Sequence, residues 1–171
     1  MFPKIIKLIL AVALLGYGGY EFYENYIGNG IFLSLLSGVF VLLYFKNEII
    51  ILAFLRLRKQ DFSGTERWLN RIKNPELSLV RKQQGYFYYL HGIIQSQQNL
   101  TIAEKHFKKA IELGLSMTHD LAMAKMSLAG ILMQKRRKRE ATALLAEAKK
   151  LDKQGMLNDQ LKMMQQQMKR I

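Results

Sequence analysis

The chain contains no cysteine among its 171 residues and only two prolines, Pro3 and Pro75. Without cysteine it can form no disulfide, no thiolate metal site and no cysteine nucleophile. Because prolines are few and no serine- or glycine-rich tract is present, a long disordered linker is not expected. The fold must therefore be inferred from the hydrophobic pattern and the charge pattern.

Signatures of catalysis and of phosphate binding are also missing. The sequence has no glycine-rich phosphate loop, no Gly-x-Ser-x-Gly elbow and no EF-hand loop, and its sparse acidic residues form no obvious acid–base pair. The histidines His91, His106 and His119 lack the i, i+4 spacing that binds a metal on one helix. We therefore expect neither an enzyme nor a cofactor or metal site, and we interpret the histidines as solvated or capping residues.

Charge is scarce in the first 45 residues, which hold only Lys4, Lys7, Glu21 and Glu24. Residues 46–171 contain 24 lysines and arginines against 11 acidic residues, and so carry the whole net charge of +13. This uneven composition predicts a domain boundary near residue 45.

Two apolar segments predict a transmembrane hairpin in residues 1–45. Ile27 to Phe45 is free of charge over 19 residues, close to the ~20 that cross a ~30 Å hydrocarbon layer. Leu8 to Tyr20 is uncharged for only 13 residues, but counting from Ile5, with Lys4 and Lys7 snorkelling outward, gives an adequate length. A cleaved signal peptide is the alternative, although no small-residue cleavage pattern follows the first run and a second apolar run comes soon after.

Small residues in both apolar segments would let the two helices approach each other closely. They are Gly16, Gly18 and Gly19 in the first segment, and Ser34, Ser37 and Gly38 in the second. We interpret them as packing the two helices on each other rather than as the seam of a homodimer.

Basic residues predict the orientation of the hairpin. The connecting loop, about Glu21 to Gly30, contains no lysine or arginine, whereas the flanks contain Lys4, Lys7, Lys46, Arg56, Arg58 and Lys59. Because positive charge is kept on the cytoplasmic side of a membrane, we expect both termini and the basic domain to be cytoplasmic.

Three segments of the basic domain align at a spacing of 38 residues, which is typical of stacked helical hairpins. The aligned sets are Thr65, Ala103 and Ala141; Leu69, Phe107 and Leu145; and Ile72, Ala110 and Ala148. Two helix-start signals also align, since Ser63 with Glu66 recurs as the capping box Thr101 with Glu104. In the third copy, Arg139 and Thr142 occupy the positions of Thr101 and Glu104, so the second helix of this copy is expected to start differently.

The second copy resembles the tetratricopeptide repeat family. Its first helix has the aromatic, leucine and small residue of that pattern, and its second helix has the alanine, aromatic and alanine; they are Phe87, Leu90, Gly92, Ala103, Phe107 and Ala110. Repeats of this family have 34 residues, so the four extra residues are expected between hairpins, around Gly114 to Asp120, with Asp120 as a helix cap.

The resemblance implies a small, membrane-anchored tetratricopeptide-type protein of the bacterial inner (cytoplasmic) membrane. The expected fold class is all-α, with a two-helix transmembrane hairpin at 1–45 and three repeats within 46–155. The repeats are placed at about 46–79, 84–117 and 122–155. The tail at 156–171, with an apolar stripe of Leu157, Leu161, Met164 and Met168, is expected to be a capping helix. A methionine-rich stripe that binds a partner is the alternative.

The 38-residue spacing places the first helix of the first repeat at about Ile49 to Lys59. No glycine or proline separates this stretch from the second apolar segment. The sequence therefore predicts one continuous helix, with Lys46, Asn47 and Glu48 at the membrane interface. A bend near Asn47 is the alternative.

A groove along the first helices of the repeats is the first candidate surface. Its expected lining residues are Tyr88, Gly92 and Gln95 in the second repeat, and Met123, Met126, Gly130 and Met133 in the third. Because the groove has little charge, it suits an apolar helix or an extended segment of a partner protein. The alternative is that the tail or the first repeat fills it.

A basic run is the second candidate surface, and it consists of Lys135, Arg136, Arg137, Lys138 and Arg139. Anionic lipid headgroups or an acidic protein would complement it, whereas no recognition motif accompanies it that would favour nucleic acid. A solvated turn is the plain alternative. The sequence thus predicts a membrane-anchored scaffold or adaptor. The alternatives are an accessory subunit that acts through its transmembrane hairpin, or a lipid or nucleic-acid binder.

Overall fold

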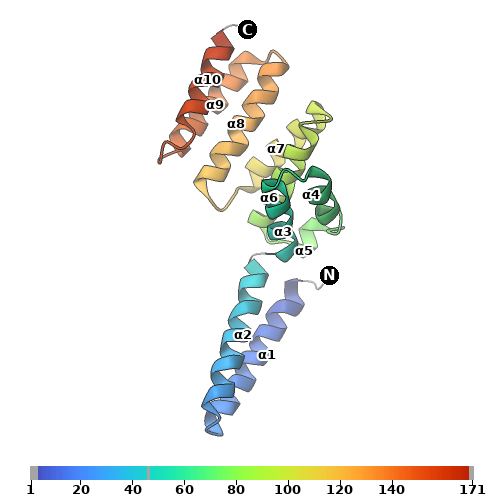
Figure 1. Cartoon of the computed structure of the whole chain (residues 1–171), viewed down its shortest axis with the longest axis vertical. Coiled ribbons are helices and arrows are strands. Elements are labelled where there is room, and N and C mark those ends of the chain that lie inside the picture. The colour runs from blue at the N-terminus through green and yellow to red at the C-terminus, as the bar shows by residue number, and fades with distance from the viewer. Residues whose placement is uncertain (1–3, 46, 170–171) are drawn as a thin grey trace.

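The computed structural model describes residues 4–45 and 47–169, and within them the chain is all-helical, with ten helices and no strand. The all-α class is therefore confirmed. Figure 1 shows an elongated molecule, with α1 and α2 side by side at one end and α8 to α10 at the other. The intervening helices lie where the hairpin meets the rest of the chain.

The two N-terminal helices form an antiparallel apolar hairpin. They are α1 (Lys4–Tyr23) and α2 (Ile27–Phe45), and both are long and apolar enough to cross a membrane. The bounds of α2 coincide with the charge-free run. Helix α1 extends further toward its carboxyl end than its uncharged stretch, so only three residues connect the helices, with Asn25 in the left-handed region at φ 65°.

Some of the small residues lie between the two helices of this hairpin, and others lie on its outer surface. The Ser37 hydroxyl donates a 2.8 Å hydrogen bond to the carbonyl of Ala11, and a Cβ added to Gly18 would lie 3.3 Å from the Leu33 Cβ. Gly16, Gly19 and Gly38, by contrast, have no other atom near the place of a Cβ. The two helices thus pack closely on each other through Gly18 and Ser37.

The connection between α2 and α3 (Glu48–Arg58) corrects the prediction of one continuous helix. Asn47 is extended, with ψ at 129°, and its side-chain oxygen accepts a 3.0 Å hydrogen bond from the backbone N–H of Ile49. An asparagine that caps a new helix ends the preceding one, because its own backbone leaves the helical region. The alternative, a bend at Asn47, is what the chain adopts. Lys46 lies outside the described residues.

Lys7 also departs from expectation. Instead of snorkelling outward it is buried, with 6% of its surface exposed, and forms an ion pair with Glu48 at the start of α3. Its ammonium group lies 3.4 Å from the carbonyl oxygen of Leu43 in α2. Lys7 therefore ties the first helix to the junction that follows the second. The side chain of Lys4 lies outside the description.

The rest of the chain forms three helical pairs and a final helix. The pairs are α3 with α4 (Phe62–Leu69), α6 (Arg81–Gln95) with α7 (Leu100–Leu113), and α8 (Thr118–Gln134) with α9 (Lys138–Leu151). The short α5 (Pro75–Ser78) separates the first pair from the second, and α10 (Asn158–Lys169) ends the chain. The four residues between α7 and α8 lie where the extra residues are expected.

The second helices of the three pairs keep the predicted register but use other caps. They begin at Phe62, Leu100 and Lys138, at intervals of 38 residues. The third helix nevertheless starts differently, as expected, because its N-cap residue Arg137 makes no side-chain hydrogen bond to the helix. The residues at the three N-caps are Asp61, Asn99 and Arg137, not Ser63 and Thr101. The Asn99 side chain accepts from the backbone N–H groups of Thr101 and Ile102, at 3.0 and 3.2 Å.

Asp61 caps α4 in the same way, and Gly64 makes room for it. The carboxylate accepts a 2.7 Å hydrogen bond from the Gly64 N–H, and a Cβ at Gly64 would fall 2.0 Å from the other carboxylate oxygen. Asp120 is not the cap of α8, because that position belongs to Met117 and has no side-chain hydrogen bond. Asp120 instead accepts a hydrogen bond from the Tyr86 hydroxyl.

Two clusters of buried apolar residues stabilise the pairs. One joins α3, α4 and α6, and the other joins α6 to α10. Tyr86 and Tyr88 pack against both. In the tail, Leu157, Leu161 and Met168 are buried as the stripe predicts, and Asp152 anchors its start by accepting from the Leu157 N–H at 2.7 Å.

Candidate interaction surfaces

The α6 half of the predicted groove consists of residues in different environments. Tyr88 is partly exposed, and its ring lies 5.8 Å from that of His106, while Gln95 is partly exposed at the end of the helix. Gly92 is buried, and a Cβ there would lie 3.1 Å from the ring of Phe107 in α7. Gly92 thus provides close packing within its own helical pair and contributes little surface.

The α8 half of the groove is partly covered by the tail. Met123 and Met126 are partly exposed and pack against the core. The nearest atom to a Cβ at Gly130 is the terminal methyl of Met164 in α10, at 3.4 Å. Met133 is only 6% exposed and lines a small hollow together with Met168 of α10. At this end of the groove, therefore, the tail helix α10 fills the space, which is the alternative stated above.

Tyr86 connects α6 to α8. Its hydroxyl donates to the Asp120 carboxylate, and burial together with this acidic neighbour raises the pKa of Tyr86 to about 12. The tyrosine therefore remains protonated and can donate at any physiological pH. This hydrogen bond fixes one pair against the next and so sets the position of the candidate groove residues on α6 and α8 relative to one another.

Two histidines come together although they are distant in sequence. The rings of His91 and His106 stack with centroids 5.5 Å apart, beside the rings of Phe87 and Tyr88. Burial, with a smaller contribution from His106, lowers the pKa of His91 to about 4, and burial also lowers the pKa of His106. Both rings are therefore neutral near pH 7 and belong to an aromatic packing cluster.

The basic run is only partly available to a partner. Lys135 and Arg137 both form ion pairs with Glu104 of α7, at 2.7 and 2.6 Å, and Lys108 forms a third at 2.7 Å. Arg137 also pairs with Glu140. Two of the five predicted cations are thus used within the fold.

Three cations of the run remain directed to solvent: Arg136, Lys138 and Arg139 are exposed and take part in no ion pair among the described residues. Arg136 occupies the left-handed region at φ 58°, which turns the chain between α8 and α9. The outward face of the turn is therefore less basic than the sequence suggests.

Glu104 is the centre of this network rather than part of a capping box. Burial raises the pKa of its carboxyl group, but hydrogen bonds from Lys108, Lys135 and Arg137 outweigh that effect and bring the pKa to about 2. The carboxylate is therefore ionised at neutral pH. Its partners lie up to 33 residues away, so no local pattern could have indicated them.

Among residues 4–45 and 47–169, no group of three histidine, aspartate or glutamate side chains could hold a metal ion. Comparison of the chain with protein-family models, with curated proteins and with solved structures finds no match.

Proposed function

We propose that the chain is a membrane-anchored interaction scaffold or adaptor of the tetratricopeptide type, without catalytic activity. In this proposal α1 and α2 span a bacterial inner membrane, and both termini lie in the cytoplasm with the helical pairs. The recurring 38-residue register of α4, α7 and α9 supports a repeat architecture. Helix α10 would close the far end of the stack.

The observation that carries the proposal is that uncharged side chains remain partly exposed on two successive first helices. They are Tyr88 and Gln95 on α6 and Met123 and Met126 on α8, and we call them the α6/α8 strip. Methionine side chains adapt to varied apolar partners, and aromatic residues supply large contact area. Such a strip fits an apolar helix or an extended segment of a partner protein.

Site-specific photo-crosslinking in cells tests this strip. A photoreactive phenylalanine analogue is placed at Gln95 or at Met126, and matched controls carry it at Met163 and Leu77, which are 56% and 71% exposed. We expect discrete protein adducts from the strip positions alone. Equal adducts from all four positions, or none from the strip, would contradict the proposal.

Protease accessibility tests the orientation. In inside-out membrane vesicles the helical pairs should be digested, while in right-side-out vesicles they should be protected. The reverse pattern would place the basic domain outside the cytoplasm and would reject the positive-inside assignment.

A further inference from the structure

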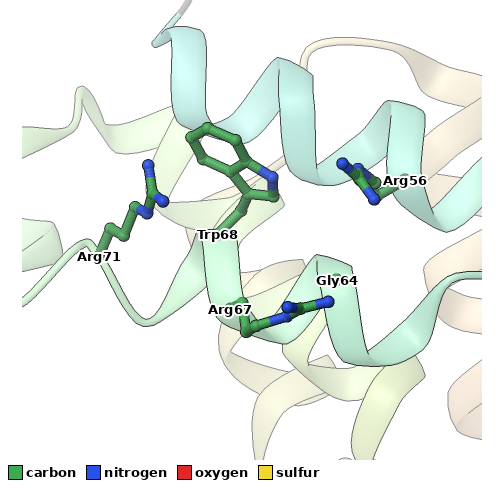
Figure 2. Close-up of a pocket in the computed structure, with 5 residues that line it drawn as sticks. All are labelled: Arg56, Gly64, Arg67, Trp68 and Arg71. Atoms are coloured by element: carbon green, nitrogen blue, oxygen red, sulfur yellow. The ribbon is translucent and has the colours of Figure 1, made fainter.

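Three arginines and the single tryptophan of the chain line one hollow, with Arg56 and Arg67 on one side of the tryptophan ring in Figure 2 and Arg71 on the other. Arg56 comes from α3, Arg67 from α4 and Arg71 from the segment after it; together with Gly64 and Trp68 they line about 200 Å³ (Figure 2). The arginine pocket lies on the first helical pair, apart from the α6/α8 strip.

Two of these arginines are held in place by neighbouring side chains. The guanidinium carbon of Arg71 lies 4.0 Å from the centre of the Trp68 ring, a cation–π contact. Arg56 donates a 2.9 Å hydrogen bond to Asp61, which is itself fixed as the cap of α4. Because these contacts limit side-chain freedom before any ligand arrives, less entropy is lost when one binds.

Positive charge in the arginine pocket exceeds negative charge. Asp61 is the acidic partner of Arg56, whereas Arg67 and Arg71 form no ion pair among the described residues. Guanidinium groups that share a hollow repel one another, and an anion between them relieves this repulsion. Each guanidinium also presents a planar fork of N–H donors, which matches the oxygens of a phosphate group.

The position of the pocket brings it near lipid headgroups if α1 and α2 span a membrane. Arg56 lies eight residues after the start of α3, which is about 12 Å along a helix. Tryptophan is enriched at the boundary between headgroups and water, where its ring is half apolar and half polar. The phosphate could therefore belong to an anionic lipid or to a phosphorylated compound in solution.

We propose that Arg56, Arg67 and Arg71, together with Trp68, form a binding site for a phosphate group, carried by an anionic lipid headgroup or by a soluble phosphate compound. The site is separate from the protein-binding strip and does not depend on it. Arg67 supplies the free N–H donors. It makes no cation–π contact with Trp68 and no ion pair with Asp61.

Trp68 makes a direct test possible, because as the only tryptophan it reports on the pocket alone. The full chain in neutral detergent micelles is titrated with dihexanoyl phosphatidylglycerol or with pyrophosphate, at constant ionic strength. Dihexanoyl phosphatidylcholine, whose headgroup has no net charge, is the lipid reference, and a separate titration with sodium chloride measures the effect of ionic strength itself. We expect a saturable change in Trp68 fluorescence with one or both anionic phosphate probes and with neither reference.

Two matched variants complete the experiment. Arg67→Gln removes one pocket guanidinium without touching the Arg71–Trp68 contact, and should weaken the apparent affinity about tenfold, the loss of one charge-assisted hydrogen-bonding group. Arg139→Gln removes the same charge from an exposed position in α9 and should leave the affinity unchanged. Circular dichroism verifies that both variants remain helical.

Each outcome decides the proposal or the source of the phosphate. Saturation with both probes shows that the phosphate itself is recognised. Saturation with the lipid alone assigns a headgroup, and saturation with pyrophosphate alone assigns a soluble ligand. If neither probe saturates, or if Arg67→Gln binds as well as the unaltered chain, the proposal is wrong.

Discussion

Glu104 is a residue whose role depends on partners far along the chain. Its spacing from Thr101 fits a capping box, yet its carboxylate points to Lys135 and Arg137 across the gap between two helical pairs. A carboxylate that is 9% exposed is stable there only because three cations offset its loss of hydration. The basic run also depends on Glu104, because the carboxylate neutralises part of the positive charge of this run.

Replacing Glu104 with glutamine should lower the free energy of unfolding by about 1.5–3 kcal/mol, the usual contribution of a hydrogen bond to a charged group. Chemical denaturation at pH 7, followed by circular dichroism, measures the loss. Glu140→Gln is the control, because Glu140 pairs with Arg137 at an exposed position and should cost under about 1 kcal/mol. Equal losses in the two variants would contradict a central role for Glu104.

The pH dependence of the same variant has a defined direction. The pKa of Glu104 lies near 2 in the fold, below its ordinary value of 4.5, so the charged form is stabilised by folding. Its contribution is complete above pH 4.5 and is lost as the pH falls toward 2. The stability difference between the chain and Glu104→Gln should therefore shrink over that interval.

At the scale of helices, the sequence predicted periodic features well and local ends less well. The charge-free run located α2, and the 38-residue spacing located the second helix of each pair, because burial requires apolar residues at fixed intervals. The caps were misplaced by two residues, since serine or threonine followed by glutamate competes with a nearby asparagine or aspartate for the same N–H groups.

Asn99→Ala should destabilise the chain by about 1 kcal/mol, because it removes the side-chain acceptor at the start of α7. Asn99→Asp keeps an acceptor and should restore stability. Thr101→Ala is the comparison that separates the two possible caps, and it should have a smaller effect. Thermal unfolding of all three variants in one detergent gives the ranking, and a larger loss for Thr101→Ala would reverse the assignment.

The tail helix gives a prediction about local stability. Leu161 is 2% exposed in the cluster that joins α6 to α10, so Leu161→Ala should cost about 2–4 kcal/mol locally. Amide hydrogen exchange should accelerate in α10 and the adjoining face of α8, while α3 and α4 keep their protection. Met163→Ala, at an exposed position of the same helix, should change little. Uniform acceleration would indicate a single cooperative unit instead of two clusters.

At the scale of the whole molecule, the link between the apolar hairpin and the helical pairs could not be predicted. The sequence suggested a continuous helix, because nothing between Phe45 and Glu48 forbids one, and it placed Lys7 at the membrane surface. The extended backbone at Asn47 and the contact between Lys7 and Glu48 replace that rigid rod. Contacts across 41 residues follow from the tertiary arrangement and leave no local pattern.

Lys7→Gln should loosen the helical pairs relative to the hairpin without unfolding either part. Because the chain has no cysteine, spin labels can be attached to cysteines introduced at Tyr26 and Leu77 with no background. Pulsed electron paramagnetic resonance should show a broader distance distribution in the variant. Lys125→Gln, which removes the ion pair with Glu147 inside the third helical pair, should leave the distribution unchanged. An unaltered distribution in Lys7→Gln would contradict the linking role.

The contact between Lys7 and Glu48 also bears on how the protein matures. It joins the seventh residue of the chain to the first residue of the basic domain's first helix, so it exists only while the first apolar segment stays attached. Cleavage after that segment would leave Glu48 without its partner. Retention of the first helix is therefore a condition for this link between the hairpin and the helical pairs.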